Sequence, residues 1–355
     1  MNQPAQPSEH DVVLESLPDD VLATIEIRDK FMGRLGLSRS LGLEFLVNDL
    51  QRWAPGQRLK VAFLDGNADL HRDVAEATRQ ITEACNIAFD FGEGGTGGFR
   101  RWSETDTEYA ADIRVSFDKS GYFSLVGTDS ISPNIGPANS RIGGRPNQCS
   151  LNLGGYAMQR PARWRGTVRH EFLHAIAFHH EHQNMRGPCQ ESFRWDDDEG
   201  YEPTQNERGA YVADRLGRRP GIYTFLAGAP NFWNRAKVDH NLRAEERPGL
   251  VPGPFDRESV MLYRFPEMFY KNPPSPCAPV GEGETLSAGD RAGLQHLYPG
   301  AGNESAAVVE KQRAMLAAMG GGESADRGLE SVGSPASQHI ARAAGVLRRK
   351  LQSLD

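Results

Sequence analysis

Five of the ten histidines in this chain lie between residues 170 and 182, in the stretch VRHEFLHAIAFHHEHQ (168–183). His170 and His174 are four residues apart, and on a helix this spacing places both imidazoles on one face, one turn apart. Two imidazoles so placed can bind one Zn²⁺ ion, and Glu171 can reach a water on that ion. The pattern H-E-x-x-H therefore predicts the chemistry of a zinc-dependent hydrolase that cleaves peptide bonds.

A solvated helix face that happens to carry histidines is the simpler alternative. Histidine is an indifferent helix former, so a helix gains little by clustering it. The stretch contains no histidine tag and no low-complexity repeat. The clustering therefore favours a metal site.

A third metal ligand is expected, because catalytic zinc takes three protein ligands and leaves one position open. The candidates are His179, His180 and His182. On a continuous helix His180 would lie roughly 15 Å along the axis from His170, too far to share an ion. The helix must therefore end near Ala177, and the chain must turn back.

Length and composition limit the classes of protein to consider. The 355 residues suffice for one large domain or two ordinary ones, and 38% hydrophobic with 25% charged residues is typical of a globular protein. The net charge of −7 does not favour nucleic-acid binding. No apolar run approaches the roughly 18 residues that span a membrane. Nothing in the sequence demands more than a monomer.

The N-terminus, MNQPAQPSEHDVVLESLPDD, lacks a basic region followed by an apolar core, so it is not a secretory signal peptide. The protein is expected to be cytoplasmic, to be exported by a non-classical route, or to have lost its signal. The four cysteines contain no C-x-x-C pair and could form two disulfides or none. The missing signal favours free thiols.

Three regions follow one another along the chain. Residues 1–52 form a helical preface for latency, export or docking. In residues 53–300, a strand at 59–66, a helix at 69–85 and further strands indicate an α/β layer with a mostly parallel sheet. Pro- and Gly-rich sequence from 184 to 298 predicts an irregular half that must pack on the first half or on a metal. Residues 301–355 form a tail with helices at about 304–319 and 335–353.

Further motifs accompany the histidine stretch in order along the chain. They are GYFSLVG (121–127), HEFLHAIAFHHEH (170–182), ESVMLY (258–263) and LSAGDRAGLQHLY (286–298). With ten residues from His170 to His180, residues 59–300 resemble the metzincin clan, and within it a divergent, microbial-type astacin-like zinc metalloprotease.

The resemblance implies an α+β fold of two subdomains. It comprises a mostly parallel twisted sheet with an antiparallel edge strand, an active-site helix, and an irregular C-terminal subdomain with a closing helix. It also makes His180 the third ligand of one catalytic Zn²⁺ ion, and His179 and His182 bystanders. The family has glycine at the turn where this chain has Ala177, and a left-handed alanine costs about 1–2 kcal/mol.

The resemblance also implies roles for other residues. Glu171 is the general base of a zinc endopeptidase, and the Tyr263 hydroxyl stabilises the developing oxyanion beside the zinc. Met261 lies beneath the metal site and serves packing. The substrate, a protein or peptide, pairs with an edge strand made of Tyr122, Phe123, Ser124, Leu125 and Val126.

Besides Ala177, further features depart from the family. No F-x-G-D latency motif precedes the domain. In astacins the glutamate after the third histidine, here Glu181, contacts the mature N-terminus, a role that the long preface puts in question. Two other functions stay open: a catalytically silent zinc protein that binds peptides or a partner, and a metalloprotease of another clan that uses a distant glutamate as third ligand.

Overall fold

The computed structural model describes residues 14–36, 50–92, 98–244, 253–319, 335–352 and 354. Part of the predicted helical preface (37–49) and the segment between the two predicted tail helices (320–334) lie outside these residues. Within the described part of the chain, every helix is too short or too polar to cross a membrane.

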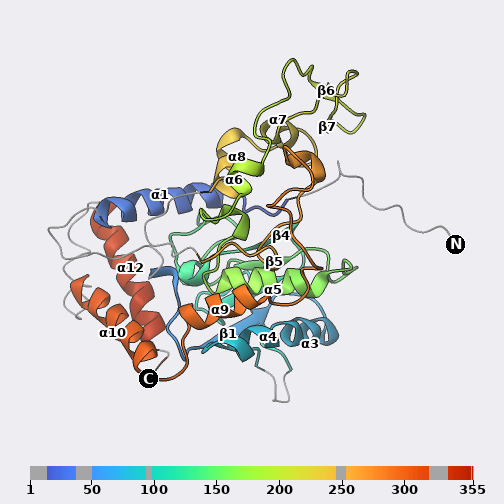
Figure 1. Ribbon diagram of the computed structural model, residues 1–355. Helices are drawn as coiled ribbons and strands as arrows, with labels where there is room; N and C mark the ends of the chain where they lie inside the picture. Colours follow the sequence, from blue (N-terminus) through green and yellow to red (C-terminus); the bar gives the residue numbers. More distant parts are fainter. Residues whose placement is uncertain are drawn as a thin grey trace.

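A five-stranded sheet forms the centre of the molecule (Figure 1). Its order is β2-β1-β3-β5-β4; β1 pairs in parallel with β2 and β3, β3 pairs in parallel with β5, and β4 pairs antiparallel with β5 at the edge. This confirms the expected α+β fold with a mostly parallel sheet and an antiparallel edge strand. The strands are β1 (Arg58–Phe63), β2 (Ala88–Asp90), β3 (Ile113–Ser116), β4 (Tyr122–Ser124) and β5 (Leu151–Leu153).

Helices cover the sheet and enclose the main apolar core. They are α3 (Ala68–Ala77), α4 (Arg79–Ala84), α5 (Trp164–Ala175) and α9 (Ala288–Leu297). Fully buried Val61 and Leu151 from the strands pack in one cluster with Phe172 of α5 and Leu294 of α9. The core thus fixes the histidine helix against the sheet.

The single helix predicted for 69–85 is in fact two helices that meet at Thr78. Its hydroxyl donates to the carbonyl of Ala75, at 2.8 Å. Such local hydroxyl bonds compete with the helical ladder, which accounts for the break.

The chain between α5 and α9 forms an upper lobe, seen at the top of Figure 1. Its elements are η4 (Glu181–Gln183), α6 (Cys189–Ser192), β6 (Thr204–Gln205), β7 (Tyr211–Val212), α7 (Ile222–Ala227), α8 (Arg235–Leu242) and η5 (Glu267–Phe269). The sequence predicts that this half depends on the first half for packing. Instead it has its own apolar cluster, which includes Phe193, Ile222, Phe225 and Leu262. This core is formed largely by aromatic residues that are far apart in an irregular sequence, so no periodic pattern marks them.

The cysteines also differ from expectation. Cys189 and Cys277, separated by 88 residues, form a disulfide within the upper lobe, whereas Cys85 and Cys149 are free. The expectation of free thiols is therefore wrong for two of the four. A bridge between such distant residues closes a long loop, which disfavours the unfolded chain.

The preface packs on the sheet edge. Its helix α1 (Asp19–Gly36) buries Val21 and Ile25 against Leu125 and Ile135, and Arg28 forms a buried ion pair with Asp129 of η3 (Gly127–Ile131). Residues 14–18 are not helical, contrary to the helical preface predicted from the sequence. Pro18 explains this, because the residue before a proline is disfavoured in the helical region.

The tail forms the two expected helices, α10 (Asn303–Ala318) and α12 (Pro335–Gln352), which lie side by side at one flank (Figure 1). Met315 and Leu347 are buried between them. The fully buried Lys350 donates to the carbonyl of Arg52 at 2.6 Å, so the tail holds the chain just before β1.

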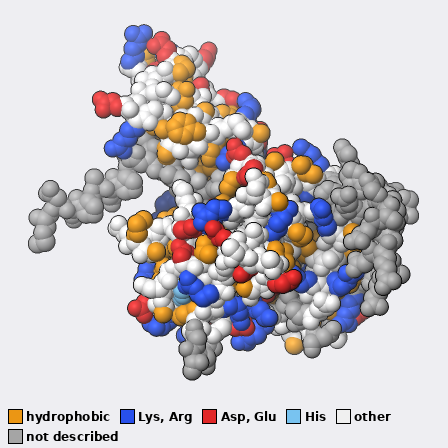
Figure 2. All heavy atoms as spheres, turned by 180° about the vertical axis from the view of Figure 1, so that it is seen from behind, with side chains coloured by type: hydrophobic (Ala, Val, Ile, Leu, Met, Phe, Trp, Pro, Cys, Tyr) orange, Lys and Arg blue, Asp and Glu red, His pale blue; other side chains and the backbone are white. Residues whose placement is uncertain are grey.

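Charged side chains are interspersed over the body in Figure 2, whereas hydrophobic ones gather on part of the upper lobe.

Candidate metal centre

Helix α5 presents two histidines with their rings fixed by backbone carbonyls. His170 Nδ1 donates to Val260 O and His174 Nδ1 donates to Phe178 O, each at 2.7 Å. With the proton on Nδ1, each Nε2 carries a lone pair. The two Nε2 atoms lie 3.2 Å apart, so both can face one cation.

The expected turn is present directly after this helix. Helix α5 ends at Ala175, and Ala177 has φ 73°. This is the left-handed conformation for which the family that the sequence resembles has glycine. The amide of Phe178 bonds back to Leu173 O at 3.0 Å, as in a helix-terminating motif. The turn reverses the chain and brings His180 Nε2 to 3.0 Å from His174 Nε2.

Of the two remaining histidines, His182 points away from the cluster. Its Nε2 bonds to the carbonyl of Asn241 at 2.8 Å and its side chain is fully buried. His179 also lies outside the group of ligand atoms that converge. Of His179, His180 and His182, the structure therefore brings only His180 to the cluster with His170 and His174.

A fourth ligand atom comes from the preface, which the sequence did not predict. The carboxylate of Glu15 lies 3.2 Å from His170 Nε2, 3.6 Å from His174 Nε2 and 3.7 Å from His180 Nε2. One ligand atom from each of these four residues lies within 4.8 Å of the others. Burial opposes ionisation of Glu15, but the histidines outweigh it and hold its pKa well below the usual range.

Glu171 is fully buried beside this cluster. Neither of its carboxylate oxygens has a hydrogen-bond partner among the described residues. Burial, followed by repulsion from Glu15, raises the pKa of Glu171 well above its usual value. An unpartnered buried carboxylate is costly for stability, and such groups mark functional sites.

The site suits a zinc ion by its donor set. Three imidazole nitrogens and one carboxylate oxygen are ligands that Zn²⁺ prefers in four-coordinate sites. The Nδ1–carbonyl bonds supply the outer partners that zinc-binding histidines usually have. Burying four such polar groups close together costs free energy, and a bound cation would offset that cost.

Met261 lies in a turn that supports His170. The side chain of Met261 is buried in the main core, and the preceding carbonyl, Val260 O, accepts the His170 proton. Asp290 of α9 holds this turn: it accepts from Ser259 Oγ at 2.6 Å and from the Val260 amide at 3.1 Å. The closing helix therefore orients a candidate ligand through the turn.

Glu181 has internal partners in this structure. Its carboxylate accepts from the Asn184 side-chain amide and from the Asp256 backbone amide, both at 2.9 Å. Burial raises the pKa of Glu181 to about 7. It therefore ties the turn after His180 to the irregular segment before Met261, and the Met261 carbonyl accepts the Glu181 amide at 2.9 Å.

Tyr263 lies against the histidines. Its ring stacks on His170, with centroids 5.2 Å apart, and its hydroxyl donates to Glu15. Burial, followed by the Glu15 and Glu171 charges, raises the pKa of Tyr263 well above its usual value, so the hydroxyl keeps its proton.

The predicted edge strand is at the sheet edge, although it is shorter than expected. Tyr122, Phe123 and Ser124 form β4, the Leu125 amide extends the pairing to Ser150 O at 2.8 Å, and Val126 precedes η3. One side of β4 pairs with β5, and in the sheet its other side has no strand partner among the described residues. Substrate pairing along this edge stays a prediction.

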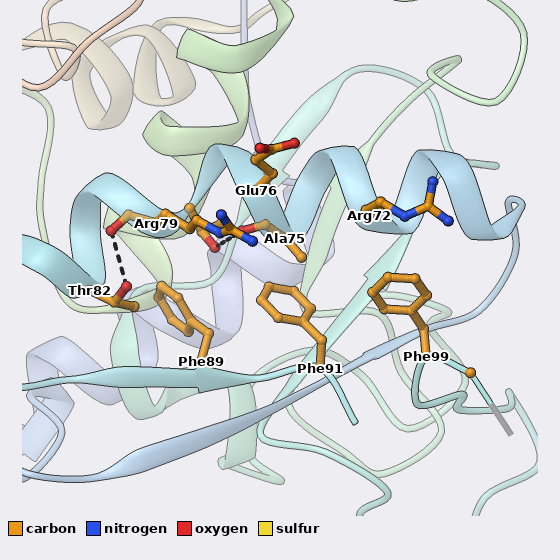
Figure 3. A pocket seen from close by; sticks show the side chains of 10 residues that line it. Arg72, Ala75, Glu76, Arg79, Thr82, Phe89, Phe91 and Phe99 are labelled. Atoms are coloured by element: carbon orange, nitrogen blue, oxygen red, sulfur yellow. Dashed lines mark hydrogen bonds between the residues drawn. The ribbon is translucent and has the colours of Figure 1, made fainter. Parts of the chain in front are cut away.

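A cavity of about 470 Å³ is lined by residues of α3, α4 and β2 and by Phe91 and Phe99 (Figure 3). In Figure 3 the rings of Phe89, Phe91 and Phe99 face the helices that carry Arg72 and Arg79. None of its lining residues belongs to the histidine cluster.

Comparison with known proteins gives matches among solved structures only. No protein-family model matches the chain, and no curated protein matches it. Two structures of myroilysin match with 25% and 22% identity over 70% of this chain, covering 96% and 86% of theirs, with TM-scores of 0.48 and 0.40.

A third match is high choriolytic enzyme 1, a hatching enzyme zinc-protease from the medaka fish Oryzias latipes. It is 16% identical over 70% of this chain and 94% of its own, with a TM-score of 0.37. All three TM-scores lie below 0.5.

The histidine helix, the turn at Ala177 and the sheet with its antiparallel edge occur together in this one chain. In these features it resembles an astacin-like zinc metalloprotease.

Proposed function

We propose that this protein is a zinc-dependent endopeptidase that binds one catalytic zinc ion through His170, His174 and His180. The observation that carries the proposal is the convergence of three Nε2 atoms beside a buried, unpartnered carboxylate, that of Glu171. Bound there, a zinc ion supplies Lewis acidity, which polarises a peptide carbonyl and makes water more acidic.

Glu171 handles the proton in this proposal. Its carboxylate takes a proton from the attacking water and passes it to the nitrogen of the departing amine. Tyr263, which stays protonated, can donate its hydroxyl hydrogen to the carbonyl oxygen of the cleaved bond.

Replacement of Glu171 by glutamine tests this function. The substitution is made in a chain that already carries Glu15→Ala, and the two chains, with and without Glu171→Gln, are compared at equal zinc content for cleavage of denatured casein. We expect the variant to cleave at least about 100-fold more slowly, the lower bound for a general base. Equal cleavage by both would exclude Glu171 as the base. Bound zinc with no cleavage by any form, including one relieved of Glu15, would favour the silent peptide-binding protein instead.

We also infer that the preface keeps the enzyme latent. Glu15 occupies the position at the histidines that a substrate carbonyl and water need, and Tyr263 is engaged with it. The buried Arg28–Asp129 pair fastens the helix that follows. Export and docking remain other uses of the same segment.

Glu15→Ala tests latency directly. Removal of the carboxylate opens the ligand position, so we expect cleavage to rise at least about tenfold at unchanged zinc content. The matched control is Glu26→Ala on α1, which removes only an exposed contact to Lys30. If Glu15→Ala and Glu26→Ala cleave at the wild-type rate, the preface does not block the site.

A further inference from the structure

The preface segment 14–18 crosses the candidate active site. Glu15 lies at the histidines, and its neighbours on either side contact different parts of the protein. Leu14 joins the apolar cluster of the upper lobe, whereas Leu17 packs toward the sheet edge. A short stretch of chain thus bridges both subdomains at the metal site.

Leu14 is almost completely buried, with 8% of its surface exposed. It belongs to the cluster that includes Trp195, Leu262 and Phe265. Its backbone amide donates to Asn231 Oδ1 at 3.1 Å, which fixes the segment by a main-chain contact as well. This contact region is named the upper seat.

Leu17 is partly buried against two further clusters, which contain Phe123 and Leu125. These two residues belong to the predicted substrate edge. The surface that Leu17 contacts is named the lower seat. Between the seats, Glu15 contacts the three histidines.

Glu15 lies at the three histidines and its charge acts on Glu171, so a peptide bond that takes its place comes beside both, and we expect a bound substrate to follow a similar path. Side chains on either side of that bond would then meet the two seats. Burial of a large apolar side chain in such a surface is favourable, whereas a charged side chain would lose its hydration without a partner.

We propose that the upper and lower seats are the enzyme's side-chain subsites, and that it selects peptides with large apolar residues on both sides of the cleaved bond. The two residues are separated by two positions, as Leu14 and Leu17 are. This inference rests on the proposed endopeptidase function and adds its substrate class.

The first test maps cleavage sites with the full chain carrying Glu15→Ala together with Leu14→Ala and Leu17→Ala, so that both seats are free. Peptides from a denatured proteome are digested and the cut positions are read by mass spectrometry. We expect leucine, isoleucine, methionine or phenylalanine to be enriched at two positions that flank the cut and are separated by two residues. Enrichment of acidic or basic residues there, or no enrichment, would overturn the proposal.

A matched set of fluorogenic peptides gives the size of the effect. One carries leucine at both positions, and the others carry aspartate or lysine at one of them. We expect kcat/KM to fall at least about tenfold for each charged peptide, since a single apolar contact discriminates by roughly 10- to 200-fold. Equal values for leucine and charged peptides would contradict the assignment.

A binding measurement separates this proposal from the proposed function. Zinc-loaded full chains carrying Leu14→Asp and Leu17→Asp together, or both leucines changed to alanine, release the segment from its seats. We expect the labelled peptide VLESLP to bind them at least tenfold more tightly than VDESDP, by fluorescence anisotropy. Ile27→Asp, at an exposed position of α1, is the control and should keep the seats filled and bind neither peptide.

The outcomes distinguish the two ideas. If the variants distinguish the two peptides but show no proteolysis, the seats are peptide-binding sites and the proposed endopeptidase function is wrong. If proteolysis occurs but both peptides bind equally, the endopeptidase function stands and the assignment of the seats as subsites is wrong.

Discussion

A single backbone angle decides which histidine joins His170 and His174. Three imidazoles follow the helix within four residues, and their types alone do not distinguish them. The left-handed turn at Ala177 directs His180 to the cluster and leaves His182 facing Asn241. The same turn places its strain at an alanine, where the family has glycine.

Loss of His180 should remove the metal. His180→Ala deletes one of three nitrogen ligands, so we expect zinc affinity to fall by more than the roughly 10- to 100-fold that loss of an outer partner costs. His179→Ala should keep its zinc. Zinc content after dialysis against a graded chelator measures both, and equal retention by the two variants would show that the ligand is misassigned.

Ala177→Gly should leave stability unchanged or raise it. Relief of the left-handed strain is worth about 1–2 kcal/mol, and the greater freedom of the unfolded glycine offsets about 0.4–1 kcal/mol. Ala175→Gly, at the buried last residue of α5, also removes a methyl group from the main core and should instead lower the free energy of unfolding by about 1 kcal/mol or more. Urea titration compares the free energies of unfolding of the two variants. A decrease for Ala177→Gly as large as that for Ala175→Gly would mean that packing of the Ala177 methyl group stabilises the protein by more than the left-handed strain destabilises it.

At the scale of elements, the site is assembled by parts that are distant in sequence. Helix α5 supplies two ligands, the turn supplies the third, and α9 supports the turn at Met261 through Asp290. The capping box of α9 uses the same Asp290 carboxylate, which accepts from the Ser287 amide at 2.9 Å. One side chain therefore both starts the closing helix and positions a candidate ligand.

Asp290→Ala should weaken zinc binding although Asp290 touches no metal. The turn that holds Val260 O loses its two acceptors, and His170 loses its fixed orientation. We expect zinc affinity to fall roughly 10- to 100-fold, as for other outer partners. Competition with a fluorescent chelator measures it, and Gln295→Ala on the exposed face of α9 is the control. Wild-type affinity in Asp290→Ala would show that the core alone orients His170.

At the scale of the whole molecule, two apolar cores meet at the metal site. The lower core lies between sheet and helices, and the upper core is stapled by Cys189–Cys277. The preface crosses between them, and the tail holds the chain before β1 through Lys350. The preface and the tail, which lie outside the residues 53–300 predicted as the catalytic domain, thus contact that domain or the chain that leads into it.

The cysteines give a prediction about the folded molecule. Burial raises the pKa of Cys85 to about 11 and raises the pKa of Cys149, so at pH 8 both are almost entirely neutral thiols, which react poorly. We expect iodoacetamide to label the native protein slowly. Unfolding without reductant should give two labels and unfolding after reduction four, by intact mass. Four labels without reductant would show that the disulfide is absent.

Much of the architecture could be predicted because local patterns report local structure. The tail helices and the strands follow from apolar periodicity, and His170, Glu171 and His174 follow from helical spacing. The break at Thr78, the core of the upper lobe and the pairing of Cys189 with Cys277 could not be predicted in this way. Each depends on which distant residues meet.

The sequence by itself determined the histidine helix, the turn after it and the set of residues on which the proposed zinc chemistry rests, since these depend on residues within one or two helical turns. Only the tertiary structure decided that Glu15 lies at the histidines and that Leu14 and Leu17 fill seats on either side. An acidic residue in an irregular segment has no periodicity to mark it. Its role arises from packing between segments 155 residues or more apart, which the sequence pattern does not encode locally.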